Sequence, residues 1–190
     1  STLIIQNSVV LANNFTISGN GRNDAGAILS ENQFNEITGN VTFAGNTRID
    51  VTGPQLTISG VVSGSGNLQK EDAGNLVFAN PASGFTGSTT INAGQVIITS
   101  AAGAGTGNLT LNNGTTLGLE GTFDYDVGNA IVNNGGFNNI SGTSALTGTL
   151  SVGGSNVIFA SDAGLLDVQA TIDLAPSSAV TFAGEGDVEM

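Results

Sequence analysis

Residues 84–99 read GFTGSTTINAGQVIIT, and this stretch decides the structural class of the chain. It carries no charge, it has glycine near both ends and in the middle, and its apolar residues stand singly or in short runs. Gly and Asn accept positive φ angles, and Asn, Ser and Thr side chains hydrogen-bond to nearby backbone, so a sequence rich in these residues favours tight turns. The pattern predicts short strands, each with one buried face, separated by turns.

The same alternation of apolar and polar residues recurs along the whole chain in short bursts bounded by Gly, Asn or Ser. Glycines interrupt the three stretches that have some helical character, residues 25–32, 100–105 and 162–168, so we expect essentially no helix. The apolar pairs expected to face a core are Val41 and Phe43, Leu56 and Ile58, Leu76 and Phe78, Val96 and Ile98, Leu109 and Leu111, Leu117 and Leu119, Leu150 and Val152, Val157 and Phe159, Ile172 and Leu174, and Val180 and Phe182.

The charge balance limits the classes of partner and of chemistry. Of 190 residues only 9% are charged, against roughly 25% in ordinary soluble domains, and 15 acidic residues face 3 basic ones, for a net charge of −12. Nucleic acid and anionic lipid both require clustered Lys and Arg, so neither is an expected partner. The chain has no Cys and no His. This excludes disulfides, Ser-His-Asp and Cys-His catalysis and the usual zinc sites within the chain. We therefore expect no catalytic, cofactor-binding or metal-binding residues, and no apolar run long enough to insert in a membrane.

Many short strands fit a sandwich, a barrel or a solenoid, and two observations favour the solenoid. The bursts are shorter than the strands of about 5–6 residues typical of sandwiches. They also share a formula, because GNVTF, GNLQK, GNLVF, GNLTL and GNAIV begin at Gly39, Gly66, Gly74, Gly107 and Gly128. Self-similarity with variable spacing is typical of stacked coils. At roughly 20 residues per coil, residues 1–190 form one all-β domain of about nine coils, a rod about 40 Å long.

Residues 64–111, GSGNLQKEDAGNLVFANPASGFTGSTTINAGQVIITSAAGAGTGNLTL, resemble a known repeat. Gly64, Gly66, Leu68 and Lys70, then Phe85-Thr86-Gly87, then Thr89-Thr90-Ile91-Asn92-Ala93-Gly94 follow the autotransporter-associated β-strand repeat of bacterial passenger domains. The resemblance is strongest over residues 39–120. One departure is Lys70-Glu71-Asp72-Ala73-Gly74, where the family more often has glycine soon after the lysine, and this indicates a local loop change. The resemblance implies a right-handed parallel β-solenoid, or β-helix.

The resemblance also implies a location and a role. It implies an extracellular protein or one on the outer surface of a Gram-negative bacterium, and a non-enzymatic rod for adhesion or for assembly into filaments or biofilm matrix. Two alternatives stay open: a passenger stalk belonging to a larger autotransporter adhesin, and a glycan-binding or glycan-cleaving β-helix. The expected partners are further copies of the chain, joined through the ends of the solenoid, and surface or host glycans. Residues 1–10, STLIIQNSVV, are uncharged and strand-prone, which suits pairing at an open edge.

A few residues are candidates for chemistry. Asp124 and Asp126 stand two apart on one face of an expected strand, so they fit either a cation site or acid–base pair or, as we favour, a solvated acidic turn. We interpret residues 185–189 as a solvated acidic tail and Lys70 as a structural residue. The phenylalanines are expected to form a core stack rather than a sugar site, and they are Phe15, Phe34, Phe43, Phe78, Phe85, Phe123, Phe137, Phe159 and Phe182.

Overall fold

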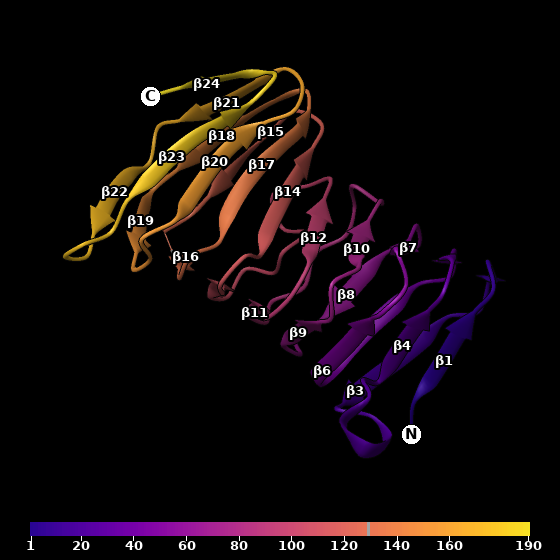
Figure 1. Ribbon diagram of the computed structural model, residues 1–190. Helices are drawn as coiled ribbons and strands as arrows, with labels where there is room; N and C mark the ends of the chain where they lie inside the picture. The colour runs from indigo at the N-terminus through magenta and orange to yellow at the C-terminus, as the bar shows by residue number, and fades with distance from the viewer. Residues whose placement is uncertain (129) are drawn as a thin grey trace.

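Parallel strands stack one above another along the whole molecule, and the two termini lie at opposite ends of the stack (Figure 1). The structure, a computed structural model, describes residues 1–128 and 130–190. Its paired strands are all parallel, and the only helix among the described residues is a short 3₁₀ turn, η1 (Arg22–Asp24). The predicted all-β, parallel β-solenoid of about nine turns is confirmed.

Three sheets form the sides of the solenoid, and each turn of the chain adds a strand to two or three of them. The first sheet is ordered β1 (Leu3–Gln6), β4 (Ile28–Glu31), β6 (Val41–Val51), β9 (Leu68–Glu71), β11 (Thr89–Ile91), β13 (Leu109–Leu111), β16 (Ala130–Val132), β19 (Thr149–Val152) and β22 (Thr171–Leu174), with β3 (Phe15–Gly19) and β8 (Val62–Gly64) also paired to β6.

The other two sheets run parallel to the same axis. The second is ordered β2 (Val10–Leu11), β5 (Phe34–Ile37), β7 (Gln55–Ile58), β10 (Asn75–Phe78), β12 (Gln95–Ile98), β14 (Thr116–Glu120), β17 (Gly136–Ser141), β20 (Val157–Ser161) and β23 (Val180–Gly184). The third is ordered β15 (Phe123–Asp126), β18 (Thr143–Thr147), β21 (Leu165–Val168) and β24 (Asp187–Glu189).

The register of the strands places inward residues in columns. One column in the first sheet runs Leu3, Ile28, Ile49, Lys70, Ile91, Leu111, Val132, Val152 and Leu174. One in the second sheet runs Leu56, Leu76, Val96, Leu117, Phe137, Phe159 and Phe182. Stacked apolar columns bury their side chains between turns, and this burial is the main stabilising term of the fold.

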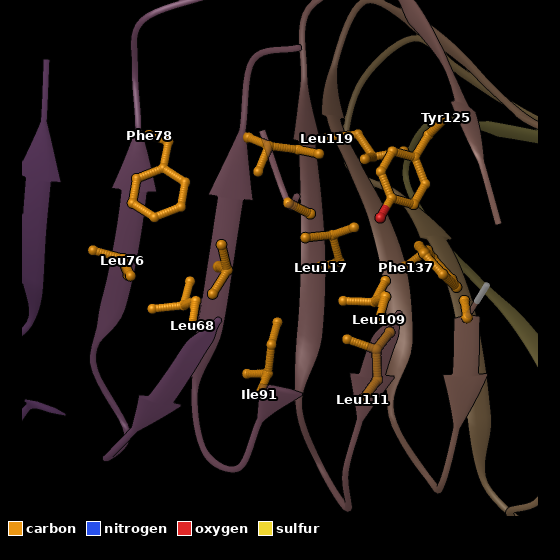
Figure 2. Close-up of a cluster of buried hydrophobic side chains, with 14 of the residues drawn as sticks. Leu68, Leu76, Phe78, Ile91, Leu109, Leu111, Leu117, Leu119, Tyr125 and Phe137 are labelled. Carbon is orange, nitrogen blue, oxygen red and sulfur yellow. The ribbon is translucent and has the colours of Figure 1, made fainter. Parts of the chain in front are cut away.

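The expected core of the central turns is confirmed. The alternating pairs of β10, β12, β13 and β14 all point inward and are buried, and Figure 2 shows the pairs of β10, β13 and β14 between the sheets. These residues are Leu76, Phe78, Val96, Ile98, Leu109, Leu111, Leu117 and Leu119.

The repeated Gly-Asn formula has a physical cause at a corner of the solenoid, where β6 bends. A Cβ on Gly66 would lie 2.0 Å from the carbonyl oxygen of Gly45, and one on Gly87 would lie 2.0 Å from that of Gly66. Only glycine therefore lets the backbones of successive turns pass so closely at this corner. The following Asn67 donates to the Oδ1 of Asn46 at 2.8 Å and accepts from the Ser88 amide at 2.8 Å, which ties three turns together.

Several local expectations were wrong. The strand expected around Val41 and Phe43 is the 11-residue β6, which continues around a corner and contributes to two sides. Phe34 lies on the outer face of β5 and is 62% exposed, so it is outside the core stack. The acidic side chains of residues 185–189 are exposed as expected, yet the segment is not a free tail, because Asp187–Glu189 form β24 and pair with β21.

Candidate functional site

Asp124 and Asp126 lie on β15, at the point where the third sheet begins. Both carboxylates are exposed and point away from the core, while Tyr125 between them is buried. The Oδ1 of Asp126 accepts a hydrogen bond from the Gly128 amide at 2.8 Å, which is a local turn contact. The two residues border a groove of about 300 Å³ together with Thr106 and Thr147. This arrangement supports the interpretation as a solvated acidic turn.

Groups of acidic residues that could hold a metal ion are absent from the described part of the chain. No helix among residues 1–128 and 130–190 is long and apolar enough to cross a membrane.

Tyr125 belongs to the interior rather than to a site. Its ring centroid is 6.4 Å from that of Phe137, and Phe137 stacks on Phe159 at 5.9 Å. Phe182 continues this stack, 5.9 Å from Phe159. Burial raises the pKa of the Tyr125 hydroxyl, and the charge of Asp126 raises it further. The tyrosine therefore packs in the core against the aromatic column of the second sheet, and its surroundings favour its neutral form.

Lys70 occupies an inward position between Ile49 and Ile91 in the aliphatic column of the first sheet, and it is fully buried. Its ammonium donates to the carbonyl oxygens of Glu71 and Asp72, both at 2.7 Å, and of Ala93 at 3.2 Å. Burial lowers the pKa of Lys70 to about 8, although nearby acidic residues oppose the shift. The side chain closes a corner from inside by satisfying the carbonyls of two successive turns, in agreement with a structural role.

Other polar residues in the interior do the same at other corners. Asn35 donates to the Ser30 hydroxyl at 3.0 Å and to the Glu31 carbonyl at 3.1 Å, and it accepts from the Val9 amide. Asn139 donates to the carbonyls of Gly142 and Ala163. The inward columns are therefore not purely apolar, because turn carbonyls inside the solenoid need donors at these corners.

A second groove, of about 350 Å³, lies on the outer face of the second sheet. It forms where Gly136 replaces the polar side chains that precede it in the outward column Gln55, Asn75, Gln95 and Thr116. The amide of Asn138 borders the groove and donates to Asp162 at 2.7 Å, and no partner for its Oδ1 is found among the described residues. The groove is a local gap in a ladder of neutral side chains.

The two ends of the solenoid are the most distinctive surfaces. At one end, β1, β2 and β3 pair with strands on one side only, and at the other end β22, β23 and β24 do the same. Inward residues that are buried in the middle turns are open here, so that Leu174 is 51% and Phe182 is 46% exposed. The expectation that these two side chains lie in a core was wrong for the chain alone, because no following turn covers them.

The first residues of the chain lie where the sequence predicted, at an edge. Outward Ile4 on β1 and Val10 on β2 are 56% and 61% exposed, and β1 and β2 are the outermost strands of their sheets. Edge strands with unpaired N–H and C=O groups are templates for pairing with another chain. The composition of residues 1–10 identifies this end, whereas the residues that form the expected second open end are not identifiable in this way.

Comparison with known proteins finds no family model that matches the chain, and no curated protein and no solved structure that is similar to it.

Proposed function

We propose that this chain is a non-enzymatic structural rod that acts outside the cell or on the outer surface of a bacterium and associates with copies of itself through the ends of its solenoid. The location rests on the resemblance of residues 39–120 to autotransporter passenger repeats. The lack of His and Cys and the small number of charges agree with a structural role.

One observation carries the proposal, namely that both ends of the solenoid present open strand edges beside open apolar columns. Contacts between unlike surfaces that do not close into a ring produce open polymers. A rod whose two ends both favour strand pairing therefore grows along its own axis. Acidic residues on its sides contribute to the net charge of −12 and oppose side-by-side association.

The edge of β2 offers a sharp test, because one residue can block pairing without disturbing the fold. Val9 and Leu11 direct their carbonyls to the amides of Glu36 and Thr38, at 3.0 and 2.8 Å. In a parallel ladder the residue between them, Val10, then directs its own N–H and C=O to the open end. A proline at Val10 removes that outward N–H and none of the hydrogen bonds that Val9 and Leu11 make to β5.

Sedimentation velocity over a range of concentrations, with circular dichroism as the check of folding, compares three chains. We expect the wild type to form concentration-dependent assemblies and Val10→Pro to shift them at least tenfold in concentration or to abolish them. Val10→Thr, which keeps the N–H and the shape of the side chain, should behave as the wild type. A wild-type chain that is folded and monomeric at all concentrations would overturn self-association and favour the stalk of a larger adhesin.

A further inference from the structure

The two ends of the solenoid are complementary to each other in the order of their inward residues. Leu174 ends a column of the first sheet that Leu3 begins. An inward column of the second sheet begins at Val9, which lies beside Asn35 of the next turn, and ends at Phe182. Placing Leu3 of a second copy on Leu174 brings Val9 of that copy to Phe182. The second spacing is two residues longer than the first, and the same difference is accommodated where Val132 and Phe137 stack on Val152 and Phe159.

The same placement of the second copy also aligns apolar residues on the third side of the solenoid. Phe15 comes after Leu11 at the same spacing at which Val188 comes after Gly184, and all four positions belong to the inward columns or their ends. Phe15 and Val188 are both partly buried against the core of their own end. One position of the second copy thus continues apolar columns on all three sides.

Hydrogen-bonding groups at the two ends also alternate in the correct phase. The amides of Thr171 and Ala175 bond to carbonyls of the preceding turn, at 2.8 and 2.9 Å, so Ile172 and Leu174 direct their peptide groups to the open end. At the other end, the Leu3 amide bonds to the Ala27 carbonyl of the following turn at 2.9 Å, so Ile4 directs its groups outward. A parallel pair needs one inward-bonded and one outward-directed residue opposite each other, and Leu174 with Leu3 meets this condition.

Charge sets the polarity of the contact. All charged residues after Lys70 are acidic, and Asp173, Glu185, Asp187 and Glu189 are exposed at the last turn. Of the three basic side chains, Lys70 is buried and Arg48 is paired with Asp50 at 2.7 Å, whereas Arg22 is exposed beside the first strand. Two last turns facing each other would repel, while the first turn carries one basic and one acidic side chain, Arg22 and Asp24, and so lacks this excess of acidic residues.

We infer that the two ends are the two halves of one interface, in which the first turn of one copy continues the last turn of another with Leu3 on Leu174 and Val9 on Phe182. The inference rests on the proposed self-association and adds its polarity and register. The partner is a second copy of this chain, in the same orientation along the axis, as the opposite positions of the termini allow (Figure 1).

Cysteine cross-linking tests the register directly, because the chain has no cysteine of its own. In this register Val10 of one copy stands opposite Ala183 of the other, on the outer face of the second sheet. Adjacent parallel strands lie about 4.8 Å apart, within the Cα separation of a disulfide. We therefore expect a mixture of Val10→Cys and Ala183→Cys chains to yield disulfide-linked dimers on mild oxidation, read by non-reducing electrophoresis.

The matched control moves one cysteine by two residues along the same face. Thr181 is exposed and outward on β23, and a cysteine there would stand about 8 Å from Val10→Cys, too far for a disulfide. We expect at least tenfold less cross-linking in this mixture and little in either Val10→Cys or Ala183→Cys alone. Sedimentation of the same reduced samples reports whether the chains associate.

The outcomes separate this inference from the proposed function. Association with cross-linking of Val10→Cys to Ala183→Cys supports both. Association with stronger linking to Thr181→Cys contradicts the register, and strong linking of Ala183→Cys to itself contradicts the polarity, while self-association stands in both cases. Reduced chains that remain monomeric overturn the proposed function and this inference together.

Discussion

Phe78 and Phe182 occupy equivalent kinds of position in the same sheet, yet one is closed and the other is open. Phe78 lies in the middle turns, fully buried, with its ring centroid 6.4 Å from that of Phe43. Phe182 stacks on Phe159 with one face and leaves the other uncovered. The comparison teaches that burial in this fold comes from the next turn rather than from the strand itself, so an end keeps the chemistry of the core on its surface.

Replacing Phe78 and Phe182 in turn by alanine should give the largest difference in stability loss between the middle turns and the open end. Phe78→Ala should lower the free energy of unfolding by about 3–5 kcal/mol, because it leaves a cavity between turns. Phe182→Ala should lower it by only about 1 kcal/mol, because about half of its side chain is exposed. Denaturant unfolding followed by circular dichroism measures both. Equal losses at the two positions would contradict the distinction between closed and open turns.

A change of pH should alter the free energy of unfolding through groups buried in the middle turns, and this effect is smaller. Lys70 in the middle has a pKa lowered from 10.5 to about 8, so between these values the unfolded chain binds a proton that the folded chain does not. The free energy of unfolding should then rise from pH 8 to pH 10, by about 2 kcal/mol. Above pH 10 the raised pKa of Tyr125 acts in the opposite direction, because the folded chain keeps its proton longer.

Two variants identify these groups in pH-dependent unfolding. Lys70→Met should remove the rise between pH 8 and 10, and Tyr125→Phe should remove the fall above pH 10. Phe182→Ala at the open end should retain both. A rise that persists in Lys70→Met would show that the buried ammonium is not its source.

Asn67 tests the corner ladders, where the expected effect is smallest. Asn67→Ala should destabilise the chain by about 1 kcal/mol, because the Ser88 amide and the Asn46 side chain each lose a partner at a corner that is partly open to water. Asn14 makes the corresponding contact to the Asn40 amide at 2.8 Å in the first turn, and Asn14→Ala should cost less because that turn is stacked on one side only. Thermal unfolding compares the two, and a larger loss for Asn14→Ala would reverse the expected order.

The sequence predicts the central turns well because period-two alternation and corner glycines act locally. Leu117 and Leu119 are identified as inward by alternation alone. Alternation does not predict the third sheet. Some turns have a loop where others have a strand of this sheet, and which of the two forms depends on stacking against neighbouring turns rather than on the local sequence pattern. Nor does it predict that Lys70 and Asn139 enter the interior, since this depends on which turn carbonyls lack a donor.

The two end surfaces also differ in how far the sequence predicts them. Residues 1–10 are identifiable as an edge from their composition. The last turn is not, because Leu174 and Phe182 stand in the same alternating sequence pattern as residues that are buried in the middle turns. Residue type alone groups Phe34 with the other phenylalanines, although it stands three positions before inward Ile37 on β5 and alternation therefore places it on the opposite face.

Small-angle X-ray scattering over a concentration series tests most directly the claim that the open ends are the assembling surfaces. We expect the longest dimension of the particle to grow with concentration, while the radius of gyration of its cross-section stays that of one solenoid. A cross-section that thickens with concentration would show association through the sides, and a particle that keeps one length of about 40 Å at every concentration would show no association through the ends. Either result would contradict the claim.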